Sequence, residues 1–199
     1  ANQIYLYLGQ VNDKQNRPEQ SVSWYNKVAP GQHYLEAQVN IATAMARDGK
    51  VDLAIDKLDS LENLNTQQQI IVIQTEASLL VKAGRHQEAF DLLDKAVKNL
   101  PNTAELVYDY ALAAERLQKF DLMEAELRKT IAAMPNFAAA YNALGYSLAD
   151  RNIKLNEALS LIEKAISLSP NDHYILDSLG WVHFRKGNLN KALEYLQQA

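Results

Sequence analysis

The chain has 199 residues, of which 48% are apolar and 22% are charged, so we expect a packed core rather than disorder. Its net charge of -4 argues against a nucleic-acid-binding protein, and its lack of cysteine excludes disulfides, thiolate metal sites and a cysteine nucleophile. No apolar run approaches the ~20 residues that span a bilayer, so no transmembrane segment is predicted. Composition leaves both the cytoplasm and the periplasm open.

Glycine and proline recur at a regular interval along the chain. A spacing of 34 or 35 residues separates Pro101, Pro135 and Pro170, and separates Gly49 from Gly84 and Gly145 from Gly180. Alignment on these markers divides the sequence into six repeats, at about residues 2–34, 35–69, 70–103, 104–137, 138–172 and 173–199. A period of this length is typical of helical repeat proteins, in which each repeat is a helix-turn-helix unit.

Small residues mark the predicted contact between the two helices of each repeat. Position eight is always glycine or alanine: Gly9, Ala42, Ala77, Ala111, Gly145 and Gly180. Position twenty, on the second helix, is alanine in four repeats, so the helices can approach closely. Gly49, Gly84 and Gly187 stand at position fifteen, where the end of a helix often needs a positive φ. The proline at the end of a repeat closes its second helix.

The fifth repeat resembles the tetratricopeptide motif through Tyr141, Leu144, Gly145, Leu148, Ala158, Ile162, Ala165 and Pro170. One departure from the motif is a single extra residue in the turn 151–156 of this repeat. The resemblance covers essentially the whole chain and implies an all-α fold, a right-handed α-solenoid of six helix-turn-helix units. The last unit stops at Ala199, so we expect a fragment of a longer repeat protein with an uncapped C-terminal face.

The sequence offers no catalytic constellation. The four histidines, His33, His86, His173 and His183, lie in different repeats without a second ligand at metal-binding spacing. We interpret them as surface or capping residues. Phosphate-binding, dinucleotide-binding and zinc-protease motifs are absent. We therefore predict no enzyme, no metal and no cofactor.

In tetratricopeptide proteins, the first helix of each repeat lines a concave wall with its positions two, five, nine, twelve and thirteen. Carried onto this sequence, the resemblance predicts a partner-binding wall of Tyr108, Arg116, Asn142, Tyr146, Tyr174, Asp177, Trp181, Phe184 and Arg185. The aromatic residues could anchor a ligand or fill the seam between neighbouring first helices. Trp181 and Phe184 are the first candidates for ligand contact.

Position thirteen is basic in five repeats: Lys14, Arg47, Lys82, Arg116 and Arg185. These cations could bind an acidic or carboxyl-terminal ligand, or they could complement the dipole at the end of each first helix. Chaperone-tail adaptors of the family use lysine at position five and asparagine at position nine. No repeat has that pair, which disfavours such an adaptor.

Residues 28–37, 145–151 and 175–182 resemble a narrower group, the large proteobacterial tetratricopeptide lipoproteins of the outer membrane. One such protein is the adaptor of a carboxyl-terminal processing protease and delivers cell-wall hydrolases to it. The resemblance implies a periplasmic scaffold, anchored at the outer membrane in the full-length protein. Its partner would be a peptide or helix of another protein, such as a periplasmic protease or its substrates.

Three alternatives remain open at this point. The repeats could be the regulatory array of a larger enzyme whose catalytic domain lies outside the sequence. The C-terminal face could associate with a second copy of the chain. The protein could also reside in the cytoplasm.

Overall fold

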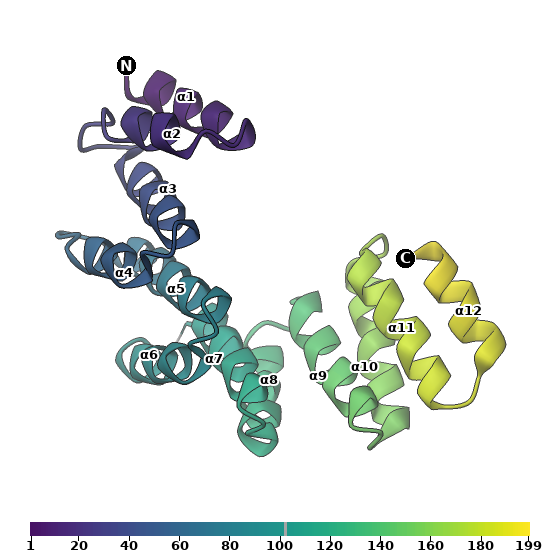
Figure 1. Cartoon of the computed structure of the whole chain (residues 1–199). Coiled ribbons are helices and arrows are strands. Elements are labelled where there is room, and N and C mark those ends of the chain that lie inside the picture. The colour runs from purple at the N-terminus through teal and green to yellow at the C-terminus, as the bar shows by residue number, and fades with distance from the viewer. Residues whose placement is uncertain (102) are drawn as a thin grey trace. The chain divides into compact units, whose positions relative to one another are not determined.

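The computed structural model describes residues 1–101 and 103–199, and all regular secondary structure in this part of the chain is helical (Figure 1). The twelve helices are α1 (Asn2–Lys14), α2 (Pro18–Tyr25), α3 (Tyr34–Arg47), α4 (Val51–Asp59), α5 (Thr66–Lys82), α6 (His86–Asn99), α7 (Ala104–Arg116), α8 (Phe120–Ala133), α9 (Ala138–Asp150), α10 (Leu155–Leu168), α11 (His173–Arg185) and α12 (Leu189–Gln198). The predicted all-α class is therefore confirmed.

Position fifteen of every repeat has the left-handed backbone that the glycines indicated. Its φ is 79° at Gly49, 76° at Gly84 and 79° at Gly187. The equivalent residues Asn16, Gln118 and Asn152 have φ of 55°, 57° and 58°. This conformation ends the first helix and reverses the chain within a few residues. The glycine pattern predicted it in three repeats, but it holds in all six.

The turn of the fifth repeat carries the predicted extra residue. Residues 151–154 join α9 to α10, whereas three residues join the two helices in each other repeat. Lys154 adopts a second left-handed conformation there, with φ of 47°. The added residue keeps Ala158 in register beneath Gly145.

One helix begins earlier than the repeat pattern predicted. The third repeat was expected to start near Ile70, but α5 begins at Thr66. Asn65 and Gln68 form a capping box, in which the Gln68 N–H donates to Asn65 Oδ1 at 2.9 Å and the Asn65 N–H donates to Gln68 Oε1 at 3.0 Å. This reciprocal cap satisfies backbone donors that would otherwise be free, and it extends the helix by one turn.

The small residues at position eight allow the helix contact for which they were singled out. A Cβ at Gly145 would lie 2.6 Å from Ile162 Cγ1 and 2.9 Å from the Ala158 carbonyl oxygen. A Cβ at Gly180 would lie 2.6 Å from Leu196 Cγ. Both distances are shorter than van der Waals contact, so the backbones of the paired helices approach as closely as glycine permits.

The chain divides into two compact halves, Ala1–Leu93 and Asp94–Ala199. The core of the N-terminal half includes two clusters, Leu6, Tyr25, Val28, Ala37 and Ile41, and then Ala42, Ala54, Leu58, Val72 and Leu79. In the C-terminal half, α9, α10, α11 and α12 pack side by side (Figure 1). None of the described helices is both long and apolar enough to cross a bilayer.

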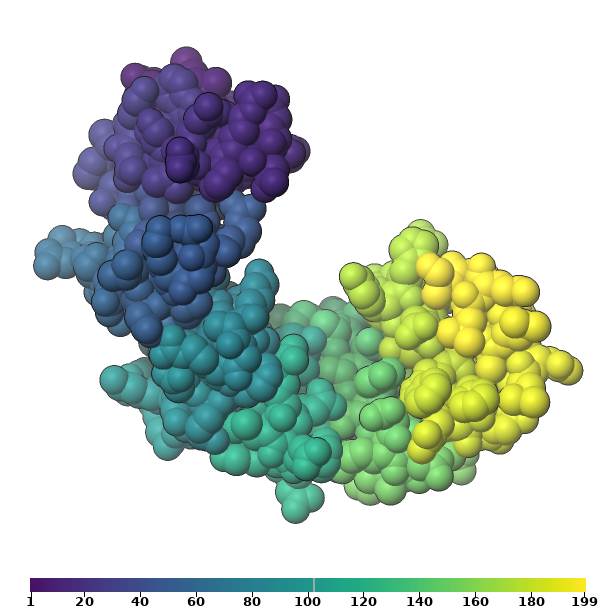
Figure 2. Space-filling model, viewed as in Figure 1, coloured from purple at the N-terminus to yellow at the C-terminus, as the bar shows by residue number. Residues whose placement is uncertain are grey.

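The last helix of the C-terminal half exposes an apolar stripe. Leu189, Leu193 and Leu196 recur along α12 and are 62%, 58% and 46% exposed. The atoms of α12 are yellow in Figure 2 and form an outer surface of this half. The residues equivalent to Leu196 in the other repeats, such as Leu127 and Ile162, are fully buried.

Candidate functional site

Three of the predicted wall residues meet on one face of α11. The rings of Trp181 and Phe184 stack with centroids 5.5 Å apart and an interplanar angle of 24°. The Arg185 guanidinium lies 5.5 Å from the centre of the Trp181 ring. Residues three and four apart share a helix face, which is why these side chains meet. Phe184 remains 50% exposed, so the cluster presents apolar surface outward.

Two polar atoms of the predicted wall lack a hydrogen-bond partner within the described residues. Trp181 Nε1 is buried and donates to no acceptor, and Asn142 Oδ1 on α9 is buried and accepts from no donor. Helices α9 and α11 pack against each other. An unpaired buried polar group costs about 1–3 kcal/mol, and such groups are rare outside strained or functional places.

Two tyrosines extend the exposed aromatic surface along α9 and α11. Tyr146 is 40% exposed and Tyr174 is 84% exposed. Tyr174 stands at the first turn of α11, where the Asp172 carboxylate caps the helix by accepting the Tyr174 N–H at 2.9 Å. We call Tyr146, Tyr174, Trp181 and Phe184 the aromatic face.

Three carboxylates act electrostatically on Tyr146. The pKa of Tyr146 is raised by partial burial and, after that, by the negative charges of Asp150, Asp177 and Glu115. Asp177 is one of the predicted wall residues, and Asp150 lies one turn after Tyr146 on α9. Each of these three charges makes the potential at Tyr146 more negative.

The predicted wall residues Tyr108 and Arg116 lie on α7 and are not part of the aromatic face. The Tyr108 ring packs edge-on against Phe137, with centroids 5.0 Å apart and an interplanar angle of 68°. Burial raises the pKa of Tyr108, followed by the charges of Asp109 and Glu115. For Tyr108 the contact with Phe137 matches the seam-filling alternative. Arg116 is exposed in the last turn of α7.

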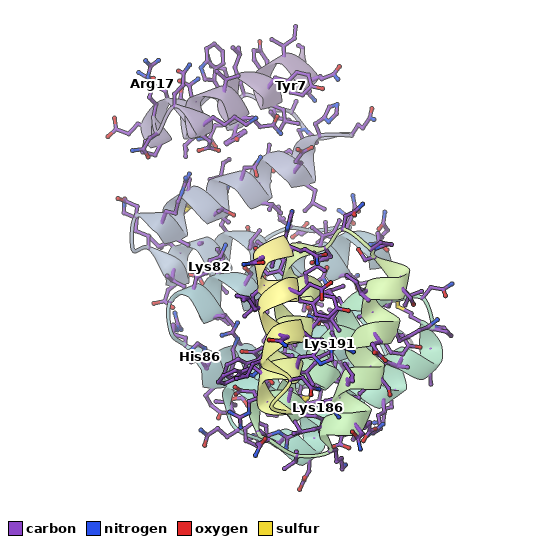
Figure 3. The ribbon with its side chains drawn as sticks, turned by 90° about the vertical axis from the view of Figure 1, so that its right-hand side faces the viewer. Tyr7, Arg17, Lys82, His86, Lys186 and Lys191 are labelled. Carbon is purple, nitrogen blue, oxygen red and sulfur yellow. The ribbon has the colours of Figure 1, made fainter. Side chains whose placement is uncertain are left out.

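The N-terminal half has a hollow that the sequence reasoning did not single out. Helices α3 and α5 enclose about 320 Å³ lined by Val39, Thr43, Ile71, Gln74, Thr75, Ser78, Leu79 and Lys82. Figure 3 labels Lys82, which lines the hollow, and His86, which begins the next helix, α6. Thr43 and Ser78 occupy position nine, where short side chains leave room. In the sequence, these two small residues were the feature that could have predicted the hollow.

A larger hollow of about 620 Å³ lies between α2 and α3, also in the N-terminal half. It is lined by Asn16, Pro18, Glu19, Val22, Ala44, Met45, Arg47, Asp48 and Lys50. Arg47 is engaged there, because its guanidinium donates to Asp13 Oδ1 at 2.9 Å. This ion pair and the stacking of Arg185 on Trp181 show that two of the five cations at position thirteen have contacts within the protein.

His183 differs from the surface or capping role that the sequence suggested. Its side chain is only 4% exposed and stacks on Tyr195 of α12, with centroids 5.6 Å apart. Burial lowers the pKa of His183, and the charge of Lys191, labelled in Figure 3, lowers it further. The prediction was wrong for His183, which is a core residue between α11 and α12.

A buried carboxylate lies in α5. Glu76 is 3% exposed, and its Oε1 accepts no hydrogen bond from the described residues. Burial, with a smaller contribution from the Asp59 carboxylate, raises the pKa of Glu76 to about 7. Among the described residues, no group of three or more histidine, cysteine, aspartate or glutamate side chains could hold a metal ion.

The chain is similar in sequence to known tetratricopeptide-repeat proteins. Tetratricopeptide repeat models match residues 75–133 and 174–199. A tetratricopeptide-repeat-containing protein of Pseudomonas aeruginosa is 35% identical over 195 residues, which are 98% of this chain and 33% of that protein. The chain thus spans about a third of that relative's length.

Solved structures show the same fold. A tetratricopeptide repeat protein from Parabacteroides merdae superimposes with a TM-score of 0.71 at 16% identity, over 99% of this chain and 78% of that one. YrrB, described as a tetratricopeptide protein with an unusual peptide-binding site, gives a TM-score of 0.57 at 21% identity, over 81% and 82% of the two chains.

Fold and matches together define an all-α tetratricopeptide-repeat solenoid. The repeats support a protein–protein interaction scaffold.

Proposed function

We propose that this chain is an adaptor that holds a peptide or helix of a partner protein on the aromatic face of α9 and α11. The observation that supports it best is the exposure of Tyr146, Tyr174 and Phe184, the last of which stacks on Trp181. Large aromatics exposed together are costly in water and are enriched among residues that dominate binding energy. YrrB, which shares the fold, is described as having a peptide-binding site.

The test replaces the stacked pair by alanine, as Trp181→Ala with Phe184→Ala. We expect the double variant to lose capture of the partner protein while its helical content remains that of the unmodified chain. The chain offers a matched control, because Tyr5 and Trp24 form another stacked pair, with centroids 6.1 Å apart, in the N-terminal half. Alanine at Tyr5 and Trp24 should leave capture intact.

The capture experiment uses the immobilised chain and a periplasmic extract, read by mass spectrometry. A protein retained by the unmodified chain and by the Tyr5/Trp24 control, but not by the Trp181/Phe184 variant, supports the proposal. Equal retention by all three chains would show that the aromatic face does not bind the partner.

We further propose a periplasmic location at the outer membrane, with a carboxyl-terminal processing protease or its substrates as partners. The support is the likeness of residues 28–37, 145–151 and 175–182 to outer-membrane lipoproteins of this kind. Fractionation of cells that produce the full-length protein tests the location. Recovery in the cytoplasm would favour the alternative compartment. A catalytic domain elsewhere in the full-length protein would instead favour a regulatory array of an enzyme.

The exposed leucines of α12 favour a second candidate, self-association. Leu189, Leu193 and Leu196 form an apolar stripe of the kind that packs against a neighbouring helix. Light scattering of the chain over a range of concentrations tests this candidate. A chain that stays monomeric at every concentration would contradict self-association.

A further inference from the structure

The aromatic face has unpaired negative charge beside it. Glu115 on α7, Asp150 on α9 and Asp177 on α11 all act on Tyr146. Within residues 1–101 and 103–199, none of these three carboxylates forms an ion pair. Some other carboxylates of the same half are paired, such as Glu124, which contacts both Arg128 and Lys154 at 2.8 Å. We call Glu115, Asp150 and Asp177 the acidic trio.

The polar groups along α9 are arranged to accept hydrogen bonds. Asn142, Tyr146 and Asp150 follow one another at intervals of one turn, so they lie in a row on one face of the helix. Asn142 Oδ1 is a buried acceptor without a donor in the described residues. A carboxylate accepts only, and the face of a tyrosine ring attracts cations. The row therefore suits a ligand that brings donors and positive charge.

Within the described residues, Arg185 and Arg116 form no ion pair with the acidic trio. Arg185 stands over the Trp181 ring, where its charge is held against the indole. Arg116 extends from the last turn of α7, a position in which a cation also complements the helix dipole. An acidic ligand would meet the acidic trio at close range, and like charges across an interface are costly.

We propose that the aromatic face and the acidic trio together bind a partner segment that presents a lysine or arginine side chain. The alkyl stem would lie on Tyr146 and the stacked Trp181, and the cationic head would lie among the three carboxylates. Long basic side chains bury their stems on apolar surfaces while the charge stays in a polar setting. Charge complementarity of this kind sets specificity and association rate. This inference rests on the proposed adaptor function and specifies the chemistry of its partner.

The test uses four degenerate, fluorescein-labelled nonapeptide pools that differ only in a fixed central residue: lysine, arginine, glutamate or leucine. Fluorescence polarisation measures their binding to the whole chain. We expect the lysine and arginine pools to bind about five-fold or more tightly than the other two. The preference should shrink when the salt concentration rises from about 0.05 M to about 0.5 M, because salt screens exposed charges.

Two double variants locate the effect. Asp150→Asn with Asp177→Asn should lower the binding of the two basic pools to the level of the leucine pool. Asp121→Asn with Glu194→Gln removes two exposed carboxylates from the second helices of their repeats and should change nothing. Circular dichroism of each variant confirms that the helices remain folded.

The outcomes separate this inference from the function on which it rests. Equal binding of all four pools, lost in the Trp181/Phe184 alanine variant, would overturn the basic-ligand inference and keep the peptide-binding face. Preference for the glutamate pool would overturn it as well. Binding of no pool would overturn both proposals. A basic preference that survives at full strength in the Asp150/Asp177 variant would show that these two carboxylates do not hold the basic side chain, and it would overturn the inference.

Discussion

Replacement of Glu76 by glutamine tests whether the buried carboxyl group of Glu76 destabilises the fold when it is ionised. The carboxyl group is buried in α5, and its pKa in the fold is about 7 against an ordinary value of 4.5. The difference corresponds to a cost on the order of 3 kcal/mol for keeping the ionised form folded at neutral pH. Glutamine has nearly the same shape but carries no charge, so it removes this cost.

The direction of the pH dependence follows from the raised pKa of Glu76. Between pH 4.5 and about 7 the folded chain holds a proton that the unfolded chain has released. The contribution of Glu76 to stability is therefore fully present below pH 4.5 and is lost as the pH rises to about 7. The glutamine variant lacks this dependence, so the two chains should diverge as the pH rises.

Thermal melts followed by circular dichroism measure the divergence. For a chain of this size each kcal/mol moves the Tm by about 2–4 °C, so Glu76→Gln should raise the Tm by about 5–10 °C near pH 8 and by little near pH 4. Glu62→Gln is the matched control, because Glu62 is exposed in the connection before α5. A Tm difference that is the same at both pH values would refute the reasoning.

Two further predictions concern the repeat geometry. Gly180→Leu should overpack the contact with Leu196 and lower the free energy of unfolding by about 1–3 kcal/mol, and an unchanged urea midpoint would contradict the assigned register. Gln118→Gly should stabilise the chain by about 0.5–1 kcal/mol, because glycine adopts the φ of 57° without the steric cost borne by glutamine. Gly49→Ala is the reciprocal change and should lower the Tm.

The pairing of helices was predictable because it depends on residue types with narrow physical roles. Gly145 and Gly180 stand where no Cβ fits, and the spacing of such residues reveals the period. The early start of α5 was missed because the second repeat has no proline at its end to mark the boundary. Asn65 and Gln68, three residues apart before an apolar run, were nevertheless a readable capping-box signal.

The role of each aromatic residue was less predictable, since the same side chain suits a core seam and a binding face. Tyr108 contacts Phe137, which belongs to the segment before α9 and is remote in the repeat pattern. His183 was misread for a similar reason, because its burial depends on Tyr195 of the following helix. Periodicity identifies the helix face of a residue, but the partner across that face comes from the tertiary structure.

Position thirteen is basic in five repeats, and Asp150 is the acidic exception in the fifth repeat. It is the last residue of α9, where the helix dipole favours a cation and disfavours a carboxylate by about 0.3–1 kcal/mol. If Asp150 served stability alone, its replacement would lower the Tm. We instead expect Asp150→Asn to raise the Tm slightly while it weakens binding of the lysine pool, as is common when a binding residue is held at some cost to the fold. A variant that loses both stability and binding would assign Asp150 to the scaffold and not to the ligand.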